Sequence, residues 1–382
     1  MTAEPAGVLE AADTLVVSDL HLGAANGADL LRRDGLARRR LLERLSTVHR
    51  LVVSGDLLEL RHGPAALILD RAREALAALG AALGPDGELV VLTGNHDHVV
   101  LRPWIAERRL AGEPLGVAAL IDPDRASPLT RAIGEAVGGA RGPRLRFAYP
   151  GAWLSPPGGD GGPSVFVTHG HYQDAVWRMP TVERLIAVGV ARAHGVDHAD
   201  LRTPEQFEAL LAPAYGWLDG MAEYARGTAA ASSQRTSAGV WHQLTAGRGP
   251  RARALRVAVP LAVRALARAG LGDLEHRLGH ETLRISGLRG MARMLAALGI
   301  EADHAIVGHL HRAGPLPGDA AWEWRLEHGG RLWNSGSWVH SGPLLHGHGP
   351  GTPYWPGRAV HVPAGGAPAL EGLLDDVDDP WG

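Results

Sequence analysis

The 382-residue chain contains no cysteine and no lysine. Without cysteine it can form no disulfide, no thiolate metal site and no cysteine nucleophile, so any metal must be held by His, Asp, Glu or Asn. Without lysine, every strong cation is an arginine. The formal net charge is −3 and aromatic residues make up 5% of the chain, so the composition carries no strong nucleic-acid signal.

Long apolar runs are also missing. No 18-residue segment is both apolar and free of charge, and residues 1–13 lack the basic start and apolar core of a signal peptide. We therefore expect a cytoplasmic protein. The apolar fraction of 45% is sufficient for a packed core, and the length allows one large domain or two ordinary ones.

The first hundred residues alternate between two kinds of segment. Residues 14–19, 51–56 and 89–94 are short β-branched runs that stop at a glycine or a polar residue, which is typical of buried strands. Residues 30–45 and 65–83 lie between them and carry apolar residues at helical spacing. This alternation predicts an α/β fold with a mostly parallel sheet and ligands near the carboxyl ends of its strands.

The pattern changes after about residue 140. Residues 144–154 and 164–169 predict a hairpin or an element of a second sheet. Strands resume at 304–309, 331–339 and 358–362, and the acidic tail, residues 373–382, is expected to fray.

Residues 175–300 show no strand signal and contain helical pieces, with a small polar segment, 226–239, that we expect to be mobile. The simplest organisation is an α/β core formed by residues 1–174 and 301–382. A helical insertion or cap, residues 175–300, interrupts this core.

Five of the expected strands end in side chains of the kind that bind metals. One such motif is weak, because Asp-x-His arises easily in a chain with 20 histidines, but five at strand ends indicate a shared site. On extended backbone, residues two apart point to the same side, so Asp19 with His21 and His309 with His311 can each face one cavity. Neighbouring glycines permit tight turns. The motifs SDLHLG, SGDLLE, TGNHDH, VTHGH and VGHLHR supply Asp19 and His21, Asp56 and Glu59, Asn95 and His96, His169 and His171, and His309 and His311.

In their order along the chain, Asp-x-His, Gly-Asp, Gly-Asn-His-Asp, His-Gly and Gly-His-x-His resemble the motifs of the calcineurin-like metallophosphoesterases. The resemblance covers about residues 13–174 and 301–340. It implies a sandwich of two sheets flanked by helices. It also implies a dinuclear hydrolase in which a hydroxide between two metals attacks a phosphate ester or a diphosphate.

The same resemblance implies a set of metal ligands. One metal would be held by Asp19, His21, Asp56 and His311, and the second by Asp56, Asn95, His169 and His309, with Asp56 as the bridge. Mixed nitrogen and oxygen ligands without sulfur favour two divalent ions, Mn²⁺ or Fe²⁺/Fe³⁺, with Zn²⁺ as a further option.

Other motif residues receive roles beside the metals. His96 matches the family's catalytic histidine, which protonates the leaving oxygen or stabilises its charge. Glu59 would orient His96, raise its pKa and fix its tautomer, unless it is an exposed acid at a helix start. His98 and His171 would lie on the substrate side or be incidental, and Asp97 would stabilise the turn.

The insertion after the His-Gly motif resembles that of bacterial UDP-2,3-diacylglucosamine pyrophosphohydrolases. That branch has an arginine where this chain has His96, so its substrate does not transfer. A phosphorylated small molecule, such as a nucleotide, or a lipid-linked diphosphate agrees with the motifs. The alternatives are a metal-dependent nuclease and a catalytically silent protein-binding scaffold of the same fold. The sequence does not indicate the oligomeric state.

Residues 251–270 predict an amphipathic helix, kinked or broken at Pro260. Its arginine face is either solvated or part of a cap that presents cations to substrate phosphates. It could also lie against a membrane surface, which would place the protein at the inner face of the membrane. The arginines concerned are Arg253, Arg256, Arg264 and Arg268.

Overall fold

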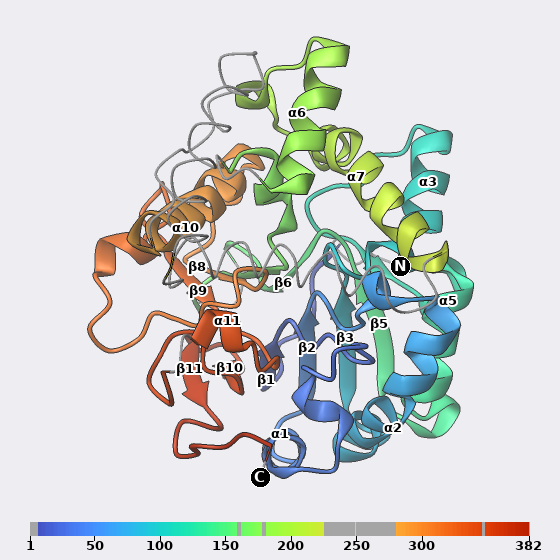
Figure 1. The fold of residues 1–382 in the computed structure, drawn as a ribbon, viewed down its shortest axis with the longest axis vertical. Helices are drawn as coiled ribbons and strands as arrows, with labels where there is room; N and C mark the ends of the chain where they lie inside the picture. Colours follow the sequence, from blue (N-terminus) through green and yellow to red (C-terminus); the bar gives the residue numbers. More distant parts are fainter. Residues whose placement is uncertain are drawn as a thin grey trace.

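The protein was analysed as a computed structural model, which describes residues 7–158, 162–177, 181–224, 249, 280–345 and 348–381. The fold is α/β, with two mixed β-sheets flanked by helices (Figure 1). Two predictions fall outside the described residues: the mobile segment 226–239 and the amphipathic helix 251–270.

The larger sheet has the strand order β11-β10-β1-β2-β3-β5-β4. Its centre is parallel, and antiparallel strands are added at both edges. The strands predicted near residues 14, 51, 89 and 358 are confirmed. The strands are β1 (Thr14–Val17), β2 (Arg50–Ser54), β3 (Glu88–Leu92), β4 (Leu120–Ile121), β5 (Arg144–Ala148), β10 (Arg358–Val362) and β11 (Ala369–Gly372).

The smaller sheet has the order β6-β7-β8-β9, in which β6 is antiparallel to β7 and the other pairs are parallel. The predicted second-sheet hairpin is confirmed for residues 151–155 and 165–168, whereas residues 144–148 belong to the larger sheet, because the chain passes from one sheet to the other at Tyr149 and Pro150. A proline has no N–H to donate to a strand ladder, so the strand ends there. The strands are β6 (Gly151–Ser155), β7 (Val165–Thr168), β8 (His304–Val307) and β9 (Arg331–Asn334).

The two sheets pack against each other through one set of alternating strand residues. The other set faces helices, because successive side chains of a strand point to opposite faces. Strands that are buried on both faces are apolar throughout, which explains the continuous β-branched runs in the sequence. The inner layer includes Val16, Val52, Val90, Val165, Val167 and Ile306, and the outer layer includes Leu15, Val17, Leu51, Val53, Leu89 and Val91.

Helices cover the outer faces of the sheets (Figure 1). The helix predicted over 65–83 is confirmed, whereas the one predicted over 30–45 is interrupted. Residues Leu30–Arg32 form the 3₁₀ turn η1, and a regular helix begins only at Leu36, after the extended Gly35. The helices of the core include α1 (Leu36–Leu45), α2 (Ala65–Leu83), α3 (Arg102–Ala111), α4 (Pro123–Ala126), α5 (Pro128–Ala136) and α11 (Gly342–Leu345).

Within the described parts of residues 175–300, the regular elements are helical and no strand occurs. α6 (Val182–His194) and α7 (Pro204–Tyr224) pack against each other at one end of the molecule, and α10 (His280–Ala297) lies nearer the smaller sheet (Figure 1). The division into a core and an inserted cap stays a prediction. Among the described residues, no helix has the length and apolarity needed to cross a bilayer.

The acidic tail is packed against the core, so the prediction that it frays was wrong. Leu374 is fully buried. Its carbonyl accepts a 2.8 Å hydrogen bond from the Trp355 indole, and Arg358 Nε lies 3.0 Å from Asp375 Oδ1. Gly357, at φ +85°, leaves room for this leucine, because a Cβ there would lie 2.4 Å from its side chain.

We expect Leu374→Ala to lower the free energy of unfolding by about 2–5 kcal/mol, because it removes a buried side chain and leaves a cavity. Urea denaturation of the purified protein measures this change. The exposed Asp378→Ala in the same tail is the control and should change stability by less than about 0.5 kcal/mol. Equal effects of the two substitutions would contradict the packed tail.

Candidate metal centre

The five sequence motifs come together where strands of the two sheets end. They follow β1, β2 and β3 of the larger sheet and β7 and β8 of the smaller one. The sheets pack face to face, so loops far apart in the sequence meet at one edge of the sandwich. The backbone N–H of His309, after β8, donates to Asp19 Oδ2, after β1, at 3.0 Å.

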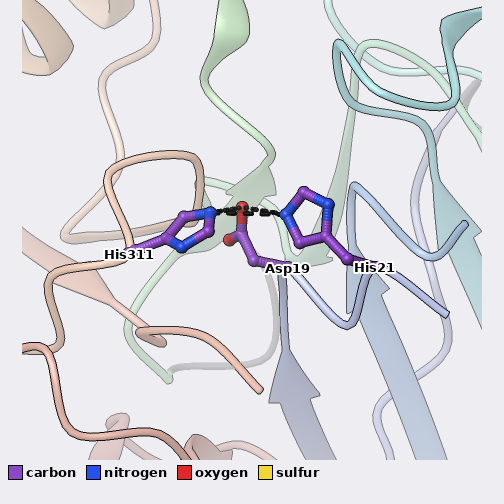
Figure 2. A group of neighbouring side chains, drawn as sticks. All are labelled: Asp19, His21 and His311. Atoms are coloured by element: carbon purple, nitrogen blue, oxygen red, sulfur yellow. Dashed lines mark hydrogen bonds and ion pairs between the residues drawn. The ribbon is translucent and has the colours of Figure 1, made fainter. Parts of the chain in front are cut away.

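Two imidazoles point at one oxygen of a buried carboxylate (Figure 2). Asp19 Oδ1 lies 3.1 Å from His311 Nε2 and 3.8 Å from His21 Nε2. The two Nε2 atoms are 3.3 Å from each other. Asp19, His21 and His311 thus form a group whose ligand atoms are close enough to hold one metal ion.

Asp56 lies between this first group and a histidine of the smaller sheet. Its Oδ2 is 3.7 Å from His21 Nε2 and 3.4 Å from His169 Nε2. Its other oxygen accepts the backbone N–H of His96 at 2.9 Å. Burial alone would raise the pKa of Asp56, but the surrounding histidines outweigh this effect and hold the pKa far below its usual range.

Asn95 extends the centre toward the second pair of histidines. Its Oδ1 lies 3.2 Å from His169 Nε2 and 3.1 Å from His309 Nδ1. A neutral amide oxygen between two imidazoles adds a ligand without adding charge. The structure therefore brings together all the residues predicted to bind metal: Asp19, His21, Asp56, Asn95, His169, His309 and His311.

The backbone is left-handed at five of these seven ligands, which corrects the expectation that the pairs Asp19–His21 and His309–His311 lie on extended backbone. Left-handed backbone costs a non-glycine residue roughly 1–3 kcal/mol and is concentrated at functional sites. Each ligand thus projects from a sharp turn that the surrounding fold maintains. Within the described residues, the non-glycine positions with positive φ are Asp19 (54°), His21 (45°), Asp56 (53°), His309 (66°) and His311 (54°).

Glycines next to the ligands make room for the opposing side chains. A Cβ at Gly55 would lie 2.3 Å from the His169 ring. A Cβ at Gly94, which precedes Asn95, would lie 2.2 Å from Asp56 Oδ1. The opposing side chains therefore pack closely against these motif glycines, and a larger residue at either position would displace a ligand.

Each central imidazole is oriented through its second ring nitrogen. His169 Nδ1 lies 2.8 Å from the Ser54 carbonyl, and His21 Nδ1 lies 2.8 Å from Glu59 Oε2. These acceptors favour a proton on Nδ1, which would leave Nε2 available to bind a metal ion. Nε2 atoms gathered around buried carboxylates form a donor set that suits a metal ion.

Asp174 orients His309 in the same way and was not identified from the sequence. Its Oδ1 lies 3.0 Å from His309 Nε2, which leaves Nδ1 for the centre. It belongs to the 3₁₀ turn η5 (His171–Ala175), only five residues after His169. The only sequence signal for Asp174 was its proximity to the VTHGH motif. Proximity alone does not show which side chain near a motif points into the centre.

Glu59 is buried and holds His96, so the interpretation as an exposed acid is wrong. Its Oε1 lies 2.8 Å from His96 Nδ1, and the carboxylate also contacts His21. As predicted, Glu59 raises the pKa of His96, but the net shift of this pKa is downward. Burial lowers this pKa, and with the contribution of Arg61 it outweighs the raising effect of Glu59.

His98 and His171 lie beside the centre and connect it to α7. His98 Nε2 is 3.0 Å from Glu208 Oε2, and the Tyr149 hydroxyl bonds to the same glutamate and lies 3.4 Å from His171 Nε2. The His171 ring is 5.6 Å from that of His169. Glu208 and Tyr149 lie outside every motif, so no sequence pattern pointed to them.

Asp97 fixes the two central loops to each other. Its Oδ2 accepts the backbone N–H groups of Leu57 at 2.8 Å and Leu58 at 3.3 Å, and its Oδ1 accepts that of Gly94 at 2.7 Å. The predicted turn-stabilising role of Asp97 is therefore confirmed, and its contacts also join the loop after β3 to the loop after β2.

No protein-family model matches the sequence, and no curated protein gives a significant match. The buried Asp and His groups can hold a metal ion. The family and the activity stay predictions that rest on the motifs and on their positions in the fold.

We expect Asp97→Asn to lower the free energy of unfolding by about 1–3 kcal/mol, because one acceptor oxygen becomes an amide that faces backbone donors. Chemical denaturation of the metal-free protein measures this effect without a contribution from bound ions. The exposed Asp86→Asn is the matched control. Equal stability of the two variants would show that Asp97 does not hold the loops together.

Proposed function

We propose that this chain is a dinuclear metal-dependent phosphohydrolase with the calcineurin-like metallophosphoesterase fold. The observation that carries the proposal is the position of Asp56 Oδ2, 3.7 Å from His21 and 3.4 Å from His169, between two sets of candidate ligands. A shared carboxylate between two histidine-rich sets is the arrangement that a two-metal site requires. The two-sheet sandwich and the order of the motifs support the same family.

The ligand set favours Mn²⁺, Fe²⁺/Fe³⁺ or Zn²⁺, because it combines imidazole, carboxylate and amide oxygen without sulfur. When bound, two such ions would supply the positive charge that polarises a phosphoryl group and lowers the pKa of a bound water. Asp19 and Asp56 would balance this charge, since both carboxylates are buried. Asp174 and Glu59 would keep His309 and His21 in the required tautomers.

His96 would assist the departure of the leaving oxygen. Glu59 holds its Nδ1, so Nε2 is the atom that would give up a proton or a hydrogen bond. Its backbone N–H is fixed by Asp56, which places the ring beside the centre. A residue at this position can act on the substrate without being a metal ligand.

The substrate would be a phosphate ester or a diphosphate. α7 would help to select it, because its Glu208 contacts His98. Cytoplasmic location and peripheral membrane contact stay predictions, since the arginine helix 251–270 lies outside the described residues. A hydrolysis panel with Mn²⁺, covering nucleotides, phospholipid diphosphates, bis-nitrophenyl phosphate and oligonucleotides and read out by chromatography of the products, tests the class. Bound metal without activity on any of them would favour the scaffold instead, and selective cleavage of oligonucleotides the nuclease.

We expect Asp56→Asn to lose metal and hydrolysis together, because it removes the negative charge shared by both ligand sets. Metal affinity should fall by more than the roughly 10–100-fold that follows loss of an outer partner. Elemental analysis after reconstitution with Mn²⁺ measures the metal content. Asp70→Asn, on the exposed face of α2, is the control and should keep both properties. Full metal occupancy in Asp56→Asn would refute the bridging role.

We expect His96→Ala to keep its metal content and to lose about 10²–10⁴-fold in kcat, because the group that assists the leaving oxygen is removed. A sharper comparison measures the rates on an alkyl phosphate ester, which has a poor leaving group, and on a nitrophenyl ester, which has a good one. The loss of rate should be largest for the alkyl ester and smallest for the nitrophenyl ester, whose leaving oxygen needs little assistance. Loss of metal from this variant would show that His96 is a ligand.

A further inference from the structure

Arg61 is a buried cation beside the candidate centre. It belongs to the 3₁₀ turn η2 (Leu60–His62) and lies two residues after Glu59. It is 8% exposed, and its Nη1 lies 2.8 Å from Glu183 Oε1 on α6. Its Nε and Nη2 are buried and have no hydrogen-bond partner within the described part of the chain. Two donor positions of a fixed guanidinium are therefore unused by the protein.

Tyr215 of α7 connects Arg61 with the histidines next to the centre. The Arg61 Cζ lies 5.9 Å from the centroid of the Tyr215 ring. On the same tyrosine, the ring centroids of His98 and His171 lie at 5.0 and 5.8 Å. The Tyr215 hydroxyl is buried, and it also has no hydrogen-bond partner among the described residues. Unused polar groups from η2 and α7 thus gather at one place.

The charge of Arg61 acts on the centre itself. Burial has the largest effect on the pKa of His96, and Glu59 has the second largest. Arg61 comes third, and it lowers this pKa. Asp56 and Glu59, together with Glu183, in turn raise the pKa of Arg61 against the effect of its burial. The guanidinium therefore lies within electrostatic range of the residues proposed to carry the reaction.

The neighbouring acids of α7 do not use the unpaired donors of Arg61. Glu208 already accepts hydrogen bonds from Tyr172 and Tyr149 and contacts His98. Asp219 Oδ2 lies 3.7 Å from Arg102 Nη1, so Asp219 forms an ion pair with Arg102. An anionic group that enters beside Arg61 would meet a guanidinium with two buried donor atoms that have no partner among the described residues.

Each buried donor without a partner is destabilising, so a ligand with acceptor oxygens would recover this loss. A planar guanidinium matches a phosphate group through paired N–H donors. We propose that Arg61, with the Tyr215 ring beside it, binds a second phosphate group of the substrate. The inference rests on the proposed function, and it narrows the substrate to compounds with two phosphate groups, joined as an anhydride or carried separately.

The test compares three probes, each cleaved to release a nitrophenyl product. The first is the 4-nitrophenyl ester of thymidine 5′-phosphate, which has one phosphate. The second has a 5′-diphosphate in its place, and the third carries an additional 3′-phosphate. In the Mn²⁺-loaded protein, kcat/KM should be higher for at least one probe with two phosphates, and the preferred probe distinguishes an anhydride from separate esters.

We expect Arg61→Gln to reduce kcat/KM for the preferred probe by about 10- to 100-fold relative to the single-phosphate probe, because a charged pair of hydrogen bonds is lost. Arg61→Lys keeps the charge without the planar fork and should fall between Arg61→Gln and the wild type. It also decides the matter if circular dichroism shows that Arg61→Gln does not fold. Arg109→Gln, exposed on α3, is the control.

Equal losses on probes with one and two phosphates would overturn the role of Arg61. A binding measurement separates this failure from failure of the proposed function. Calorimetric titration with methylene diphosphonate and with inorganic phosphate requires no turnover, and Arg61→Gln should weaken the diphosphonate more than the phosphate. If the wild type hydrolyses no probe, the proposed function fails, and the titration still decides whether Arg61 binds a second phosphate.

Discussion

A buried carboxylate requires compensating positive charge, and Asp56 receives it from both sheets. His21 approaches from the end of β1 and His169 from the end of β7, while the rest of the sandwich keeps water away. Much of the local structure serves this arrangement. The sharp turns aim the ligands inward, the glycines provide clearance, and Asp97 joins the loops that follow β2 and β3.

The centre is held in place at a cost that the remainder of the fold must offset. Left-handed backbone at each of several ligands is unfavourable by itself, and buried acids next to one another repel. The apolar layer between the sheets and the helices outside them supply the opposing free energy, since the strands are buried on both faces. A bound cation would relieve the remaining repulsion, which couples metal binding to the stability of these loops.

α7 brings a second kind of chemistry to the centre. Glu208 ties His98 and Tyr149 together in a hydrogen-bonded network, whereas Tyr215 lies beside Arg61 with its hydroxyl unused. The satisfied network gives rigidity, and the unsatisfied groups suit a ligand. Under the proposed function, the motif loops would provide the reaction, and α7 would select the substrate.

The sequence by itself determined the parts that depend on short-range patterns. Apolar runs located β1, β2, β3 and α2, and strand-end motifs identified all the candidate ligands, because burial and tight turns leave local signatures. Only the tertiary structure decided which distant groups meet. It divided residues 144–154 between two sheets, packed Leu374 into the core, and placed Asp174 and Arg61 beside the centre. It also set the pKa of His96 through burial, a property that the spacing of residues cannot express.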